Sequence, residues 1–430
     1  MKKKFYLALI IFSLVGQIAW VIENMYFNVF IYKMFNASAS DISLMVALSA
    51  IMAALTTIFI GALSDKLGKR KAFMVVGYLL WGLSITSFAL IDTNIISKIF
   101  VSSSVTAVGI TLVIIMDCVM TFFGSSANDA CFNAWLTDST TEGERGKAEG
   151  INSMMPLVAI LVVFGSFMGF DTSKSSSWQL IFIIIGVVVI ITSIIGIFII
   201  DEAPIEVDNN NNYFKNVFYG FKPSVIKENK KLYIDLIIFM LFNVAIQIFM
   251  PYLIIYYQVT LKLDNYVLIM APAIILAAIF TFFYGRIYDK KGFNFTILIS
   301  LIIGSIGFIV LYIFKNTILV FIGSLFMMMG YLSGMSIFGA RIRDNTPKNK
   351  SGSFQGLRII FQVLLPGVIG PAIGALVLKN ADMITNDDGT TSFIPNQNIF
   401  LFSLLVIILV ILIIGITILI NKNKKENKES

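Results

Sequence analysis

Long runs of apolar residues, separated by short polar segments, form the dominant pattern along the chain. One run, IFIIIGVVVIITSIIGIFII from Ile181, has about the 20 residues that a helix needs to cross roughly 30 Å of hydrocarbon. The runs lack the alternation of a membrane β-barrel. The pattern predicts twelve transmembrane helices, at about residues 5–33, 42–63, 72–91, 105–137, 152–170, 178–200, 232–258, 266–287, 294–314, 317–343, 353–379 and 399–420.

The composition supports an all-α membrane protein. Charged residues make up 13% of the chain and hydrophobic residues 57%, with a mean hydropathy of +0.87, whereas soluble proteins carry about a quarter charged residues. The start MKKKFYLALIIFSLVG resembles a secretory signal, but the apolar run continues past Trp20, which favours an uncleaved first span. Cys118 and Cys131 lie on one predicted helix, too far apart in sequence to pair with each other.

The spacing of the predicted helices divides the chain into two halves. We expect an N-terminal six-helix bundle over residues 1–200, a cytoplasmic linker over 201–231, a C-terminal six-helix bundle over 232–420 and a basic tail over 421–430. Phe214, Phe218 and Phe221 share one helical face of the linker, with Lys residues between them. The linker is therefore predicted to hold a short amphipathic helix on the membrane surface.

The distribution of Lys and Arg predicts the orientation. Each of the six predicted outer segments holds one Lys, and the other 26 of the 32 basic residues lie in the inner segments. The positive-inside rule then places both termini in the cytoplasm. The net charge of +7 is a consequence of this topology, and no basic, aromatic-rich surface remains to suggest nucleic-acid binding.

The two halves repeat one another in sequence. A shift of 224 residues places GALSDKLG from Gly61 on GRIYDKKG from Gly285, so that both glycines and the acid coincide. A shift of 206 residues aligns a second inner loop, with Asp138 on Asp344. The change of shift gives the first half about 18 extra residues between its third and fourth spans. The chain is therefore predicted to be a parallel duplication of six helices.

The residues of the first inner loop have distinct physical roles. Gly61 and Gly68 allow close helix approach and a tight turn. Asp65 can pair with Arg70 or lie near the positive start of another helix. The remaining Lys residues hold the loop on the inner side.

At this point the sequence resembles a known family. GALSDKLGKRKAF resembles the signature loop between helices two and three of the major facilitator superfamily, and WLTDSTTEGERGKAEG resembles the loop after helix four. The resemblance implies a secondary transporter, not an enzyme, in which two six-helix bundles rock around a central cavity. It implies a gating role, and not solute binding, for Gly61, Asp65, Gly68, Arg70, Asp138, Arg145, Asp289 and Asp344.

Candidate binding residues are the polar groups deep within predicted spans, where a charge is costly and rarely kept without use. Glu23 lies near the middle of the first helix and aligns with Gln247 of the seventh under the 224-residue shift. The alternative for each such group is hydrogen bonding between helices. Asp117 lies nearer the outer mouth, where we expect solvent to reach it. The candidates for substrate or ion binding are Trp20, Glu23, Asn24, Asn128, Asp129, Asn243, Gln247 and Tyr252.

The absence of certain residue types from the chain narrows the class of substrate. No Lys or Arg lies near the middle of a predicted helix, which disfavours phosphate and carboxylate substrates. The chain has no His, so proton coupling would need a buried carboxylate. An acid, amides and aromatic faces suit a neutral sugar or glycoside taken up with H⁺ or Na⁺ across the plasma (inner) membrane. We expect no other cofactor and no obligate protein partner beyond the lipid bilayer and the small-molecule substrate.

Two other function classes stay open. Proton-driven exporters of the family often carry an Arg four residues before a helix-four Gly, but here Met120 precedes Gly124. They also carry a Gly-Pro motif in helix five, where this chain has only Gly165 and Gly169. Both departures weaken the exporter reading. A membrane scaffold or receptor is the third class, and the two retained gate loops speak against it.

Overall fold

The computed structural model describes residues 2–100, 104–140, 142–202, 218–263, 265–346, 356–386 and 389–429, and is helical apart from one small hairpin in this part of the chain. It describes no side chains for Lys2 or for residues 142–146, 218–219 and 421–429. Two compact units are present. Unit 1 comprises Met1–Val217 and Met383–Phe393, and unit 2 comprises Phe218–Asp382 and Ile394–Ser430.

Unit 1 is built mainly from the first six long helices. The first span is continuous but changes its winding, from α1 through a π-helical turn, η1, to α2; the fourth span does the same from α6 through η3 to α7. The elements are α1 Lys2–Val21, η1 Ile22–Tyr26, α2 Phe27–Phe35, α3 Ala39–Leu67, α4 Arg70–Ser87, η2 Phe88–Leu90, α5 Thr93–Ile99, α6 Val105–Gly124, η3 Ser125–Phe132, α7 Asn133–Asp138, α8 Glu142–Phe167 and α9 Ser175–Ile199.

Unit 2 holds the remaining long helices. Its elements are η4 Phe218–Phe221, α11 Pro223–Glu228, α12 Lys230–Phe249, η5 Met250–Tyr252, α13 Leu253–Ile255, η6 Tyr256–Thr260, α14 Val267–Ile313, α15 Thr317–Asn345, η8 Ile360–Leu364, α17 Leu365–Val377 and α18 Asn398–Glu429. The hairpin strands β1 Met383–Thr385 and β2 Thr391–Phe393 pair antiparallel and belong to unit 1.

Within the described residues, eleven helices are long and apolar enough to cross a membrane. Twelve were expected, and the difference lies in α14, which joins the predicted eighth and ninth helices into 47 residues. Gly292 interrupts its helical geometry with φ 74°. Gly68, the equivalent residue of the first half, ends α3 with φ 61°. Both positions need the left-handed backbone that glycine adopts readily.

Other boundaries also differ from those expected. α8 begins at Glu142, ten residues before the predicted helix, because its polar first turns hold good helix formers such as Glu, Lys and Ala. α18 continues to Glu429 through residues expected to form a tail. The extra residues of the first half include α5, which Asp92 caps through the backbone N–H groups of Asn94 and Ile95. The predicted linker helix falls largely on residues 203–217, outside the described residues.

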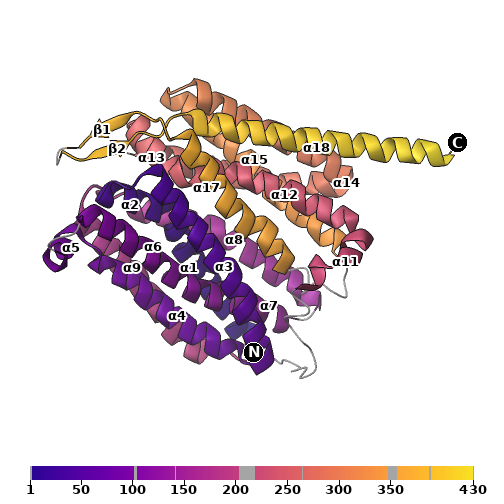
Figure 1. Cartoon of the computed structure of the whole chain (residues 1–430). Helices are drawn as coiled ribbons and strands as arrows, with labels where there is room; N and C mark the ends of the chain where they lie inside the picture. Colours follow the sequence, from indigo (N-terminus) through magenta and orange to yellow (C-terminus); the bar gives the residue numbers. More distant parts are fainter. Residues whose placement is uncertain are drawn as a thin grey trace. The chain divides into compact units, whose positions relative to one another are not determined.

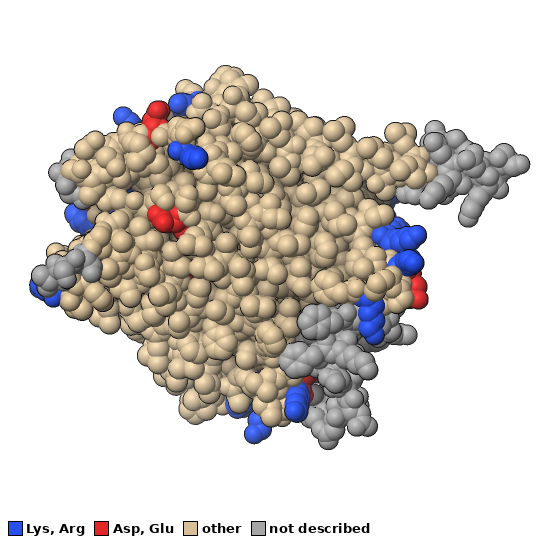
Figure 2. Space-filling view, in the orientation of Figure 1, with Lys and Arg blue, Asp and Glu red and all other residues tan. Residues whose placement is uncertain are grey.

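The long helices expose apolar side chains on their outer faces. On α9, Ile184, Val187, Ile191 and Ile194 are exposed at helical spacing, while the opposite face is buried against unit 1. Figure 2 shows few charged side chains on the face in view. A soluble protein would bury such side chains, so these surfaces are suited to lipid.

Small residues allow the helices to pack closely. α4 lies alongside α9 (Figure 1), and a Cβ atom added at Gly82 would lie 2.7 Å from the carbonyl oxygen of Gly186. In unit 2, a Cβ atom added at Gly330 of α15 would lie 2.4 Å from the Cα atom of Gly304 of α14. Backbone approach through small residues is typical of helices packed in membranes.

The β1–β2 hairpin is anchored to unit 1 by the end of the first span. Asn36 Nδ2 donates to Thr390 Oγ1 at 2.9 Å, and Asn36 Oδ1 accepts from Asn386 at 3.0 Å and from Ser392 at 2.9 Å. Tyr32 also donates to the carbonyl oxygen of Phe393 at 2.6 Å. The hairpin is inserted in sequence between α17 and α18 of unit 2, yet it belongs to unit 1.

We expect Asn36→Gly to loosen the hairpin selectively. Glycine keeps the φ of 51° found at Asn36 but removes its three hydrogen bonds. Amide hydrogen exchange over residues 383–393 should become at least about tenfold faster, with the long helices unchanged. The matched control is Lys262→Gly, at an exposed position of unit 2 with φ 53°. Equal protection in Asn36→Gly and the parent protein would show that the hairpin is held by other contacts.

Candidate functional site

Glu23 lies on the π-helical turn of the first span and is buried, with 7% of its surface exposed. Its Oε1 atom accepts hydrogen bonds from Ser49 Oγ of α3 at 2.6 Å and from Thr121 Oγ1 of α6 at 2.8 Å. The two hydroxyl oxygens are 2.9 Å apart. Three helices of unit 1 therefore meet at one carboxylate oxygen.

The second oxygen of Glu23 has a different environment. Among the residues that the structure describes, buried Glu23 Oε2 has no hydrogen-bond partner, and neither has Asp117 Oδ1. Asp117 is 1% exposed, so our expectation that solvent reaches it is wrong for this structure. Asp117 is one turn from Thr121 on α6 and its charge interacts with that of Glu23. Its burial follows from packing of α6 against the neighbouring helices of unit 1, which depth along a helix does not reveal.

Asn128 and Trp20 are joined in a hydrogen-bonded chain. Trp20 Nε1 donates to Asn128 Oδ1 at 3.2 Å, and Asn128 Nδ2 donates to the Tyr78 hydroxyl at 2.7 Å. Tyr78 in turn donates to the carbonyl oxygen of Phe12 at 2.7 Å. Both polar ends of the buried Asn128 amide are thus satisfied within unit 1, as for a group that connects helices.

Asn24 and Asp129 are more accessible than their neighbours. Asn24 is exposed within unit 1 and donates to the carbonyl oxygen of Trp20 at 2.8 Å, beside the π-helical turn. Asp129 is half-buried on η3 and accepts from Ser125 Oγ at 2.9 Å. Its charge interacts with that of Glu23. Both π-helical segments of unit 1 therefore carry candidate residues, and such segments are frequent at functional sites.

The candidates of unit 2 lie along α12 and η5. Asn243 is buried and donates to the carbonyl oxygen of Phe239 at 2.8 Å. Tyr252 is fully buried, and its hydroxyl donates to the carbonyl oxygen of Pro371 at 3.3 Å. Gln247 is half-buried, and a Cβ atom added at Gly370 of α17 would lie 2.4 Å from its Cβ atom. A cavity shared by the two halves stays a prediction.

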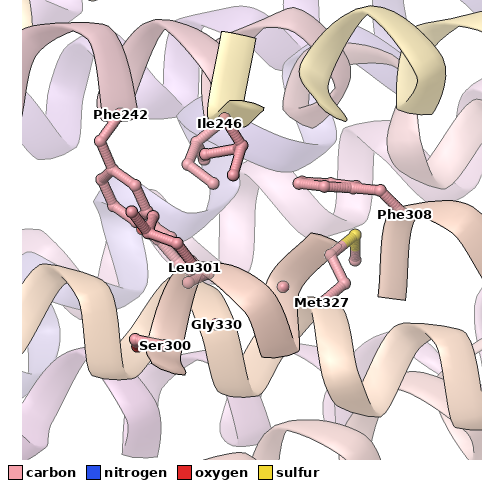
Figure 3. A pocket seen from close by; sticks show the side chains of 10 residues that line it. Phe242, Ile246, Ser300, Leu301, Phe308, Met327 and Gly330 are labelled. Atoms are coloured by element: carbon pink, nitrogen blue, oxygen red, sulfur yellow. The ribbon is translucent and has the colours of Figure 1, made fainter. Parts of the chain in front are cut away.

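A small pocket lies inside unit 2, between α12, α14, α15 and α18 (Figure 3). Side chains such as Phe242, Leu301, Phe308 and Met327 make its lining mostly apolar. Its free volume of ≈ 10 Å³ is enough for about one water molecule. In this conformation the pocket is therefore too small for a sugar-sized solute.

The loop between α3 and α4 is organised around Arg70. Arg70 is 4% exposed and donates to Asp65 Oδ1, Ser64 Oγ and, at 3.2 Å, to Asp138 Oδ2. Asp65 thus pairs with Arg70, which is the first of the two arrangements expected from the sequence. The guanidinium therefore connects the ends of α3, α4 and α7 through one buried cation. Arg145 falls on residues whose side chains the structure does not describe.

The second half forms a different set of polar contacts near the ends of its helices. Arg341 of α15 donates to Asp235 of α12 at 2.9 Å, and Asn345 donates to the same carboxylate. Tyr288 donates to Asp344 at 2.8 Å. Asp289 is exposed. The repeat in sequence therefore does not extend to a repeat of the ion pairs.

The sequence analysis missed several polar partners. Ser49, Thr121 and Tyr78 carry no signal of their own, because small hydroxyl residues and tyrosines are common in membrane helices. Asp235 had a usable signal, since an acid inside a predicted span needs a partner. Its partner Arg341 is also near a predicted span end, but no spacing in the sequence connects the two.

These features define a multi-pass helical membrane protein with polar groups buried inside its spans. The chain belongs to the Major Facilitator Superfamily, whose family model matches residues 6–371. This confirms the expected family and makes the protein a transporter, not an enzyme.

Solved transporter structures share the fold. A mutant of the nucleoside transporter NupG is similar with a TM-score of 0.74 at 13% identity, over 95% of this chain and 98% of that one. A bacterial homolog of the human lysosomal transporter Spinster, inward-facing and unoccupied, gives 0.71 at 12% identity, over 96% and 97%. The xylose transporter XylE from E. coli gives 0.69 at 13% identity, over 94% and 96%. A search of curated proteins finds no match.

Proposed function

We propose that the protein takes up a neutral polar solute, such as a sugar or glycoside, together with a cation. The observation that carries this proposal is Glu23, a buried carboxylate. One of its oxygens is held by two hydroxyl groups, and the other has no hydrogen-bond partner in the described part of the chain. A carboxylate is seldom retained inside a membrane span unless it serves an ion or a substrate. We assign Glu23 to the coupling cation.

The polar groups around Glu23 favour a neutral solute. Among the described residues, the groups that interact with Glu23 are hydroxyls and carboxylates, and none is Lys or Arg. A phosphate or carboxylate substrate would lack a positive partner there. Asn24, Asp129 and Gln247 are not fully buried within their units, which makes them our candidates for contact with the solute. NupG and XylE, named for a nucleoside and for xylose, are consistent with a solute of this class.

We also propose twelve spans, with both termini in the cytoplasm, in a plasma membrane. α14 supports the count, because 47 residues at 1.5 Å per residue make about 70 Å of helix, more than twice the thickness of the hydrocarbon. Gly292 is the expected boundary between its two spans. The excess of Lys and Arg in alternate segments supports the orientation.

Uptake into vesicles tests the proposal. Right-side-out vesicles that contain the protein receive a panel of labelled sugars, glycosides and nucleosides, with an inward Na⁺ gradient, an inward H⁺ gradient or neither. We expect one class of neutral solute to accumulate severalfold under one of the gradients, and to equilibrate without accumulation when the gradient is collapsed. Vesicles without the protein are the control.

The alternative outcome is export. Loss of preloaded cationic or apolar compounds from the vesicles under an H⁺ gradient, without uptake of any neutral solute, would overturn the uptake proposal. Met120 makes this outcome unexpected, because it is buried and apolar where proton-driven exporters often carry Arg.

A further inference from the structure

The C-terminal end of the first span binds the second strand of the β1–β2 hairpin. Tyr32 donates to the carbonyl oxygen of Phe393 at 2.6 Å, and the two rings meet edge to face with their centroids 5.2 Å apart. The Asn36 side chain donates to Thr390 and accepts from Ser392, each at 2.9 Å. Tyr32, Ser392 and Phe393 are buried, so water does not replace these contacts when they form. The first span therefore anchors this strand through its side chains.

The seventh span binds the same stretch of chain two residues later. Thr260, the last residue of that span, donates to the carbonyl oxygen of Pro395. The 224-residue shift that relates the two halves aligns Thr260 with Asn36. The two repeats therefore use equivalent positions to hold one segment, residues 390–395, which we call the strap.

The strap passes from unit 1 to unit 2 between these two anchors. Tyr32 and Phe393 belong to unit 1. Thr260 and Pro395 belong to unit 2. Two residues of chain span at most about 7 Å, and proline favours extended backbone at the residue before it, here Ile394, so the chain between the anchors has little length to give. Both anchors can form together only while the C-terminal ends of the two spans remain close.

The two anchors differ in strength. In the described part of the chain, the first span makes at least three side-chain hydrogen bonds to the strap, whereas Pro395 has one, from Thr260. Neutral hydrogen bonds contribute similar amounts to stability, so the anchor at Thr260 is expected to open first. The base of the hairpin is closed by the Ile394 N–H group, which donates to the carbonyl oxygen of Asp382 at 2.7 Å. The hairpin can therefore stay folded on the first span after that anchor opens.

We propose that the strap is an outer gate: Thr260 holds Pro395 while the C-terminal ends of the first and seventh spans are close, and releases it when they separate. The hairpin moves with the first span in both states. In the proposed orientation these ends face outward, at the opposite end of α3 from Arg70. The inference needs only that the two repeats move relative to one another during transport. It does not depend on the solute or the coupling cation proposed above.

Distances between spin labels test the gate without any solute. The labels are attached at two exposed positions, Ser40→Cys after the first span and Asn265→Cys after the seventh, with Cys118 and Cys131 replaced by Ala. Pulsed electron resonance of the reconstituted full-length protein gives the distribution of distances. Thr260→Val keeps the shape of the side chain but cannot donate. We therefore expect the population with longer distances to rise at least about threefold, as for the loss of one hydrogen bond.

Three further measurements separate gating from general loosening. Tyr32→Phe keeps the ring contact with Phe393 but removes the hydrogen bond, and should shift the distances in the same direction. Thr281→Val is the matched control, because this half-buried hydroxyl of unit 2 donates within its own helix at 2.8 Å, and its distances should equal those of the parent protein. Hydrogen exchange over residues 383–393 should stay slow in Thr260→Val, because the hairpin keeps its bonds to the first span.

The remaining results overturn the proposal. Unchanged distances in both Thr260→Val and Tyr32→Phe exclude the gate, and an equal shift in Thr281→Val does so too. Faster exchange of the hairpin in Thr260→Val would show that Thr260 stabilises the fold of the hairpin and does not hold a moving strap. If Thr260→Val does not fold, the distances in Tyr32→Phe decide. Vesicles that accumulate no neutral solute would refute the proposed function alone and leave the gate in place.

Discussion

Glu23→Gln should abolish accumulation of solute against a gradient, while passive exchange of the solute continues. Glutamine has the same shape and keeps an oxygen that can accept from Ser49 and Thr121. It cannot gain or lose a proton or carry the charge that attracts Na⁺. We therefore expect the ratio of internal to external solute to fall to about 1, which is the value when no gradient is coupled to transport.

Two measurements separate coupling from folding in this variant. Accumulation is measured under the gradient that drives the parent protein, and counterflow exchange is measured with no gradient. Asp171→Asn is the matched control, since it also neutralises one carboxylate but on an exposed loop. If Glu23→Gln accumulates solute like the parent protein, Glu23 is a packing residue, and the coupling role passes to Asp129. If exchange is lost as well, Glu23 is needed for transport itself.

The sequence was sufficient to predict the helices because hydrocarbon imposes a simple rule. Backbone polar groups inside a membrane must be paired within the segment, so a run of about 20 apolar residues has few structures open to it. The family was predictable for a related reason, since the inner loops carry a specific order of Gly, Asp, Lys and Arg. Gly292, which lies between the expected eighth and ninth helices, interrupts the helical geometry of α14 with φ 74°.

The candidate site was only partly predictable. The depth of Glu23 along the first span follows from counting residues, but its hydroxyl partners do not, because the face that each helix turns toward its neighbours depends on packing. The π-helical turns add to this uncertainty. Each inserts a residue into the helical register, so a periodicity of 3.6 residues no longer gives the faces of the residues that follow the turn.

The ion pairs of the inner loops show the limit of the sequence repeat. The aligned Asp65 and Asp289 have different environments, one paired with the buried Arg70 and the other exposed. The second half instead joins Arg341 to Asp235, which lies outside the aligned motif. A duplicated sequence therefore predicts equivalent helices more reliably than equivalent side-chain contacts.

Asp65 is paired with Arg70, so the effect of replacing Asp65 depends on what remains around Arg70. Arg70 is buried and bonded to both Asp65 and Asp138, whose side chains are 41% and 28% exposed. Loss of either acid leaves a buried guanidinium with half of its negative charge partners. The usual consequence of removing one partner of a buried pair is a destabilisation of about 3–5 kcal/mol, reduced here because the other acid remains and Asp65 is partly solvated.

Asp65→Asn should therefore leave the protein inserted in the membrane but slow transport at least about tenfold, because a difference of about 1.4 kcal/mol between conformations changes their ratio tenfold. The apolar spans that direct insertion are unchanged, whereas the ion pair that holds the inner ends of α3 and α4 in one conformation is weakened. The initial rate of counterflow, divided by the amount of inserted protein, measures this effect. Asp65→Glu should recover part of the rate because it restores the charge. The control Lys69→Gln, at an exposed position of the same loop, should transport nearly normally. Normal counterflow in Asp65→Asn would show that the charges of this loop set the orientation of the protein in the membrane and play no part in gating.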